Sequence, residues 1–97
     1  KTEKERIWLA RIIELVGFIR DSKTWSENIS QISALPNGDL IMVPRQGKER
    51  FIFGQPVDIE DKFSRIGKYY TAIVPEKGEG FYSTVNVKYA GQIVCRK

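Results

Sequence analysis

Residues 29–43 read ISQISALPNGDLIMV, a pattern typical of two strands joined by a tight turn. Ile29–Leu35 is the first predicted strand. The run Leu40–Val43 is the returning strand, apolar throughout like strands that are buried on both faces. Between them, the Asn-Gly pair at 37–38 offers the two positive-φ residues that a type I′ hairpin turn requires. A further turn leads to a third strand at Phe51–Phe53, so the sequence predicts a three-strand antiparallel meander.

A helix is predicted after the meander. Pro56 and Asp58 mark its start, and the acids at 60 and 61 lie where the N-terminal dipole favours negative charge. A helix start explains these acids, so we predict no metal site there. Apolar residues then recur at spacings of four and three, and Pro75 is expected to end the helix. The predicted stripe comprises Ile59, Phe63, Ile66, Tyr70 and Ile73. It places Tyr70 in the core and Tyr69 at its margin.

The C-terminal residues predict a hairpin. From Ser83 the sequence alternates strictly, with Val85, Val87 and Tyr89 on one face. Ala90-Gly91 is the expected turn. Gln92–Arg96 then runs back as the last strand, with Ile93 and Cys95 pointing inward.

An amphipathic helix is predicted at residues 5–20. Its stripe comprises Trp8, Ile12, Leu15 and Ile19, widened by Leu9, Ile13 and Val16. A face this broad must pack against a sheet or another domain. The resulting order, α-βββ-α-ββ, predicts an α+β fold: a mostly antiparallel sheet of about five strands, made of the meander and the C-terminal hairpin, with two helices on one face. With 97 residues, we expect a single domain, 1–97.

Composition excludes several kinds of chemistry. The chain has no His, and Cys95 is its only Cys, which excludes Ser-His-Asp catalysis, Cys/His zinc sites and internal disulfides. We therefore predict no catalytic residue and no cofactor. Sixteen basic and twelve acidic residues give a net charge of +4. The two signs are interspersed in both halves, as on a solvated surface.

A small basic nucleic-acid-binding module is the alternative function. The predicted isoelectric point is about 9.3, and Lys77-Gly78-Glu79-Gly80-Phe81 is similar to the RNA-recognition-motif signature. However, Glu79 would repel phosphate, and Thr84 stands where a stacking aromatic belongs. A glycine-containing loop before a strand is the simpler interpretation.

The last strand is the one feature that suggests a binding site. If Gln92–Arg96 lies at the sheet edge, its free N–H and C=O groups can pair with a strand of another chain. Arg96 and Lys97 are equally typical of an edge that is protected against such pairing. From the residues alone, both interpretations stay open.

Three blocks of the sequence resemble one known family. The segment 82–94, YSTVNVKYAGQIV, resembles the C-terminal signature of the bacterial division protein FtsQ, called DivIB in Gram-positive bacteria. The stretch from Asn37-Gly38-Asp39-Leu40 to Phe53-Gly54 resembles the family's meander, and Lys62-Phe63 with Ile66 and Tyr70 resembles its helix. Trp25, four residues before Ile29, fits the family's entry to the first strand. Bacteroidetes-type members are most similar. The sequence departs from the family at three positions. Members carry Asp where this chain has Asn86 and Arg where it has Lys88, and some members carry Arg where it has Gln55.

The resemblance implies a non-enzymatic divisome scaffold. Such proteins have a cytoplasmic tail, one transmembrane helix, a POTRA domain and this β domain on the periplasmic side of the inner membrane, concentrated at the division septum. We expect the present sequence to be a piece of such a chain, with residues 1–24 forming a helix that links to the POTRA domain. Membrane contact would then come only through the transmembrane helix outside this sequence, and nucleic acid is not an expected partner.

In that family the β domain binds the FtsB–FtsL pair, with a strand of FtsB added beside the terminal strand. The implied partner-binding residues here are Lys88, Tyr89, Gly91, Gln92, Val94 and Arg96. Tyr89 would be the anchor and Lys88 would meet a charge of the partner, while Gln92–Arg96 would be the backbone template. Without a partner, we expect a monomer or a weak dimer through the same edge.

Overall fold

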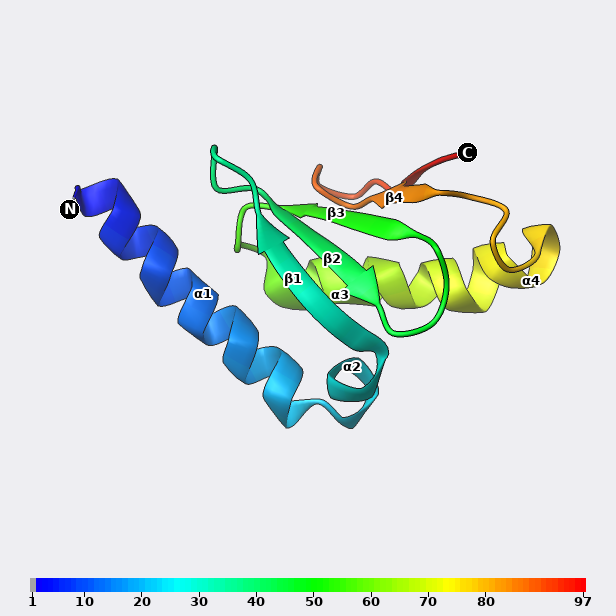
Figure 1. Ribbon diagram of the computed structural model, residues 1–97, viewed down its shortest axis with the longest axis horizontal. Coiled ribbons are helices and arrows are strands. Elements are labelled where there is room, and N and C mark those ends of the chain that lie inside the picture. Colours follow the sequence, from blue (N-terminus) through cyan, green and yellow to red (C-terminus); the bar gives the residue numbers. More distant parts are fainter. Residues whose placement is uncertain (1) are drawn as a thin grey trace.

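The computed structural model describes residues 2–97 as an α+β domain with a five-stranded sheet. The strands lie in the order β1-β2-β3-β4-β5, so spatial order follows chain order (Figure 1). The elements are α1 (Glu3–Asp21), α2 (Lys23–Asn28), β1 (Ile29–Ala34), β2 (Leu40–Pro44), β3 (Arg50–Gly54), α3 (Ile59–Lys68), the π-helix η1 (Tyr69–Ile73), α4 (Val74–Lys77), β4 (Thr84–Asn86) and β5 (Val94–Arg96). The predicted α+β class and element order are therefore confirmed in outline, with additional short helices.

The meander forms as predicted, but its first turn is of a different type. β1 and β2 pair antiparallel, with Ala34 opposite Leu40. Gly38 donates its N–H to Leu35 at 2.9 Å, and Leu35 donates to Asp39 at 2.8 Å. Only Gly38, at φ 90°, has a positive φ here, whereas type I′ requires one at Asn37 as well. The connection is instead a three-residue loop, a turn from Leu35 to Gly38 that ends in a glycine bulge. Pro36, the second residue of this turn, favours the negative φ angle that the position requires.

The sheet is mixed, not wholly antiparallel. β3 and β4 are parallel, with Phe51 opposite Val85, whereas the other three strand pairs are antiparallel. The helical segment between β3 and β4 lies behind the sheet and returns the chain to the end of the sheet at which β3 begins (Figure 1). A strand that follows such a crossover runs parallel to the strand before it.

The long helical segment continues past Pro75. α3, η1 and α4 follow without a break to Lys77, and Pro75 is the second residue of α4. Val74 bonds five residues back, to the carbonyl of Tyr69. This wider turn directly before Pro75 relaxes the usual four-residue bonding, which proline cannot complete. The prediction that Pro75 ends the helix was wrong.

The two adjacent tyrosines have the opposite roles to those predicted. Tyr69 is buried in the core, whereas Tyr70 is only half-buried. Tyr69 lies four residues after Arg65 and three after Ile66, both buried in α3, so it continues the buried face of that helix. Tyr69 also donates a hydrogen bond to the carboxylate of Glu49 at 2.7 Å, which gives its hydroxyl a partner inside the protein.

The core fills one face of the sheet. Phe63 of α3 lies at its centre, with ring centroids 5.2 Å from Phe18, 5.0 Å from Trp25 and 5.3 Å from Phe53. In β2, Leu40 and Met42 are buried, but the residues that alternate with them are only half-buried. The apolar run in β2 therefore does not mark burial on both faces.

Helix α1 buries only part of its apolar surface. Leu15 is fully buried, and Trp8, Ile12 and Ile19 pack against the core. The residues predicted to widen this stripe, Leu9, Ile13 and Val16, are exposed, with Ile13 at 73%. Only one narrow side of α1 therefore packs against the core.

Candidate partner-binding edge

The last strand lies at one edge of the sheet. β5 pairs with β4 on one side and is the final strand in the sheet order. Alternate backbone N–H and C=O groups of an edge strand point away from its neighbour. The predicted strand Gln92–Arg96 was two residues too long, because β5 comprises only Val94–Arg96.

The turn before β5 presents Tyr89 to solvent. Gln92 donates its N–H to the carbonyl of Tyr89 at 3.3 Å, and Gly91 takes φ 69° at the turn's third position. The turn predicted at Ala90-Gly91 is confirmed. Strand β4 ends at Asn86, so Tyr89 lies beyond the strand and does not follow Val85 and Val87 into the core. Its side chain is 56% exposed.

Arg65 of α3 holds this turn by hydrogen bonds to its backbone. Its guanidinium is nearly buried and donates to the carbonyl of Tyr89 at 2.7 Å and to that of Gln92 at 2.5 Å. The other side of the same group bonds Asp61 at 2.8 and 3.1 Å. Because hydrogen bonds from a charged donor are stronger than neutral ones, Arg65 fixes the entry to β5.

Lys88 is paired with a residue of the β1–β2 turn. Its ammonium forms an ion pair with the carboxylate of Asp39 at 2.7 Å. The hydrogen bond from Lys88, assisted by one from Gln55 at 2.8 Å, lowers the pKa of Asp39. The same hydrogen bond raises the pKa of the Lys88 ammonium. The positive charge of Lys88 is therefore already paired within the chain.

The stem of Lys88 lies over Gly54, the last residue of β3. A Cβ at Gly54 would stand 2.7 Å from Cγ of Lys88, and Gly54 has φ 80°. The backbone N–H of Lys88 bonds the side-chain oxygen of Asn86 at 2.8 Å. Glycine at 54 thus lets Lys88 cross the end of β3 and reach Asp39.

The structure brings the implied binding residues together in one short stretch but in different environments. Tyr89, Gly91, Gln92 and Arg96 are exposed, whereas Lys88 and Val94 are half-buried. Gln92 lies in the turn, and its carbonyl is occupied by Arg65. The accessible edge therefore comprises the exposed ring of Tyr89 and the outer backbone of Val94–Arg96.

Sequence reasoning missed Arg65, although it positions the edge. The residue lies beside the apolar stripe of α3, where a charged residue is usually solvated. The one available signal was an acid four residues earlier, Asp61, which forms an i,i+4 pair with Arg65. Nothing in the local sequence shows that the carbonyls of Tyr89 and Gln92 would lie above it.

The glycine-containing segment 77–81 forms a loop, as its simpler interpretation predicted. Lys77 is the last residue of α4, residues 78–81 lie between α4 and β4, and Phe81 is not on a strand. The ammonium groups of Lys97 and Lys77 lie 4.3 and 5.7 Å from the centre of the Phe81 ring. No strand of the described residues therefore presents Phe81 in the way the RNA-recognition motif presents its stacking aromatics.

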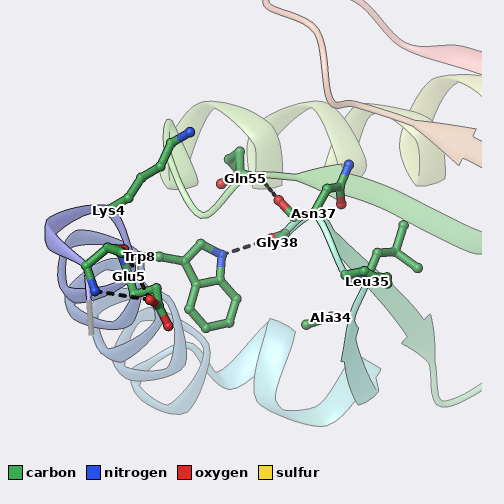
Figure 2. Close-up of a pocket in the computed structure, with 10 residues that line it drawn as sticks. Lys4, Glu5, Trp8, Ala34, Leu35, Asn37, Gly38 and Gln55 are labelled. Atoms are coloured by element: carbon green, nitrogen blue, oxygen red, sulfur yellow. Dashed lines mark hydrogen bonds between the residues drawn. The ribbon is translucent and has the colours of Figure 1, made fainter.

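A cavity of about 360 Å³ lies between the start of α1 and the β1–β2 turn. Figure 2 shows the indole of Trp8 between the two elements, donating its N–H to the carbonyl of Gly38 at 2.9 Å. Gln55 bonds the neighbouring carbonyl of Asn37 at 3.2 Å. The Trp8 bond fastens α1 to this turn, and the Gln55 bond fastens the residue after β3 to it. The same turn contains Asp39, the partner of Lys88.

One family model covers nearly the whole chain. The model of the family described as FtsQ/DivIB, C-terminal related, matches residues 1–96. The chain belongs to this family. No curated protein matches the chain. Membership of the FtsQ/DivIB-related family indicates a role in cell division among other divisome proteins, in a family of membrane-anchored, non-enzymatic scaffolds.

The helices of this FtsQ/DivIB-related chain do not resemble membrane spans. Over residues 2–97, none of them combines the length and the hydrophobicity that crossing a bilayer requires.

Proposed function

We propose that this domain recruits FtsB- and FtsL-like divisome proteins by accepting a partner strand at β5. The observation that carries the proposal is the position of β5 at the edge of the sheet, next to an exposed Tyr89. Strand addition of this kind takes its affinity from backbone hydrogen bonds and its specificity from neighbouring side chains. Tyr89 supplies such an anchor, and Arg65 holds it in place beforehand.

The proposal assigns no chemistry to the domain. The protein would be anchored in the inner membrane by a single helix, with this domain on the periplasmic side at the septum. The outer face of β5 and the ring of Tyr89 would form the contact, flanked by Arg96. Because Lys88 is paired with Asp39, it would shape the surface and would meet a partner's acid only in competition with that pair.

An NMR titration tests the proposal. The ¹⁵N-labelled domain is titrated with the periplasmic segment of FtsB from the same organism. We expect shift changes confined to residues 82–96, with new cross-strand contacts between the peptide and Val94–Arg96. No change at millimolar peptide would overturn the proposed site.

Variants separate the anchor from the backbone template. Tyr89→Ala should weaken binding at least tenfold without loss of the fold, since the ring is exposed and only its carbonyl bonds Arg65. Val94→Pro should also reduce binding, provided that its NMR spectrum stays native-like. Phe81→Ala is the control, because Phe81 is an exposed aromatic outside the edge. Equal losses for Tyr89→Ala and Phe81→Ala would contradict an anchoring role.

Salt dependence distinguishes a protein partner from nucleic acid. Binding of a single-stranded oligonucleotide should weaken steeply between about 50 and 200 mM salt, because counterions are released. Strand addition should change little over the same range. If an oligonucleotide bound more tightly than the FtsB segment, the small basic nucleic-acid-binding module would be the better description.

A further inference from the structure

Glu49 is a buried carboxylate with one unsatisfied oxygen. Its residue exposure is only 4%, and its Oε2 accepts the hydroxyl of Tyr69 at 2.7 Å. The other oxygen, Oε1, is fully buried and has no hydrogen-bond partner among residues 2–97. Because buried polar atoms in native proteins are nearly always hydrogen-bonded, an unpaired carboxylate oxygen calls for a ligand or another explanation.

Cations close to Glu49 in the sequence do not pair with it. Arg45 directs its guanidinium to the carbonyl of Glu27 at 2.7 Å. Arg50 donates to the carbonyls of Lys48 and Glu49, both at 3.2 Å, and not to the carboxylate. Within the described chain, Glu49 takes part in no ion pair. The positive charge that a buried carboxylate favours is thus not supplied by its neighbours.

The carboxylate lies on the wall of a small cavity. The cavity has a volume of about 140 Å³ and lies between the end of β2, the β2–β3 turn and the segment from η1 to the loop after α4. Its polar lining includes Asn28, Gln46 and a second acid, Glu79. Of the two acids that line the cavity, Glu49 is buried and Glu79 is exposed. Tyr70 and Val74 supply aromatic and apolar wall.

Gly47 packs against the unpaired oxygen. A Cβ at Gly47 would collide with Oε1 of Glu49, and the residue has φ 107°, which side chains rarely adopt. Only glycine therefore fits at position 47, between the cavity-lining Glu49 side chain and the backbone of the β2–β3 turn.

We propose that this cavity binds an organic cation, a guanidinium or primary ammonium group, which pairs with the carboxylate of Glu49. The ring of Tyr70 offers a face for a cation–π contact, and Val74 can cover an alkyl stem. Asn28 donates its own amide N–H to Thr24 at 2.7 Å, so its side-chain oxygen remains an acceptor. This site lies apart from β5 and does not depend on the proposed function.

A metal ion fits the cavity less well. Calcium takes six to eight oxygen ligands, usually with several carboxylates. No cluster of three or more acidic, His or Cys side chains suited to a metal occurs over residues 2–97. An organic cation needs fewer oxygens and uses the apolar wall that a metal would not.

Titration of the 97-residue chain with ethylguanidinium chloride and n-butylammonium chloride tests the proposal by NMR. We expect saturable shifts at Gly47, Glu49, Tyr70 and Gly80. The neutral analogues N-ethylurea and n-butanol should give none. Shifts from calcium chloride alone, or equal shifts from the neutral analogues, would overturn the proposal.

Two matched variants connect the binding to Glu49. Glu49→Gln keeps an acceptor for Tyr69 and the shape of the side chain, and should weaken cation binding at least tenfold. Glu14→Gln removes an exposed carboxylate on α1 and should leave binding unchanged. If Glu49→Gln bound the cations as the native chain does, or if the native chain bound neither, Oε1 would be satisfied by water only and the proposal would fail.

Blocked peptides Gly-Arg-Gly and Gly-Lys-Gly distinguish the two sources of such a cation. Binding of either peptide at least tenfold tighter than its free analogue would support a side chain of a partner protein as the ligand. Equal or weaker peptide binding, with saturable binding of the free cation, would support a small molecule. Both outcomes require loss of binding in Glu49→Gln.

Discussion

Arg65 in α3 donates a hydrogen bond to the backbone carbonyl of Tyr89 at 2.7 Å, across 24 residues of sequence. A second bond reaches Gln92, so one nearly buried guanidinium holds both ends of the turn before β5. The exposed ring of Tyr89 and the free edge of β5 are thereby fixed relative to the core. Preorganisation of this kind lowers the entropy cost of binding a partner.

Removal of Arg65 should loosen this edge. Arg65→Met keeps much of the volume but leaves the carbonyls of Tyr89 and Gln92 without their charged donor. We expect a loss of about 2–4 kcal/mol in the free energy of unfolding, measured with urea. Hydrogen exchange in residues 89–96 should accelerate more than in β2. Asp61→Asn is the control: Asp61 is 62% exposed, so the loss should stay below about 1 kcal/mol. Similar losses for the two variants would contradict the positioning role of Arg65.

Gly54→Ala should disturb the Lys88–Asp39 pair. The new Cβ would stand 2.7 Å from Cγ of Lys88, and alanine is also strained at a φ near 80°. Gly78→Ala is a matched control, since Gly78 has φ 90° and a Cβ there would meet nothing within 4 Å. We expect Gly78→Ala to cost about 1–2 kcal/mol from backbone strain, and Gly54→Ala to cost more. An equal loss of thermal stability in the two variants would show that the Lys88 side chain moves aside freely.

The Asp39 carboxylate should make stability depend on acid pH. Its pKa is lowered from the ordinary 3.8 in the folded state, mainly by the hydrogen bond from Lys88. The stabilisation is therefore fully present above about pH 4 and is lost as the pH falls through the folded-state pKa. Asp39→Asn should unfold at lower urea than the native chain at pH 7, and this gap should shrink at pH 2.

Asp21→Asn is the control for that measurement, because Asp21 and its partner Arg20 are both about three-quarters exposed. Its unfolding midpoint should match the native chain at both pH values. A gap for Asp39→Asn that is the same at pH 7 and pH 2 would exclude the ionised carboxylate as its cause.

The two tyrosines near Glu49, Tyr69 and Tyr70, should ionise only at high pH. Burial and the charge of Glu49 raise the pKa of Tyr70 to about 12, and burial with the hydrogen bond to Glu49 raises the pKa of Tyr69 as well. Their stabilisation is present below pH 10 and is lost as the pH rises toward 12. Absorbance at 295 nm should show two late ionisations, and Glu49→Gln should move both to lower pH. Unchanged ionisation in that variant would show that burial alone raises these pKa values.

Local patterns were sufficient for the strands of the meander, the stripe of α3 and the turn at Ala90-Gly91. Each depends on residues close in sequence: alternation, a 3.6-residue period, or a glycine with positive φ. The resemblance to FtsQ/DivIB rested on such blocks, and the family match over residues 1–96 confirms it. The same patterns failed at Pro75, where a π-turn lets the helix continue, and at Tyr69, which is buried although it lies outside the predicted apolar stripe.

The sequence by itself thus determined the α+β class, the order of the elements and the family of this protein, because these follow from residues a few positions apart. Only the tertiary structure decided that Arg65 holds the Tyr89 turn, that Lys88 is paired with Asp39, and that Glu49 is buried with a free oxygen. The first two are contacts between groups far apart in the sequence, and the third depends on which neighbours exclude water. Burial and pairing of charges are settled by packing of the whole chain, and no local pattern encodes them.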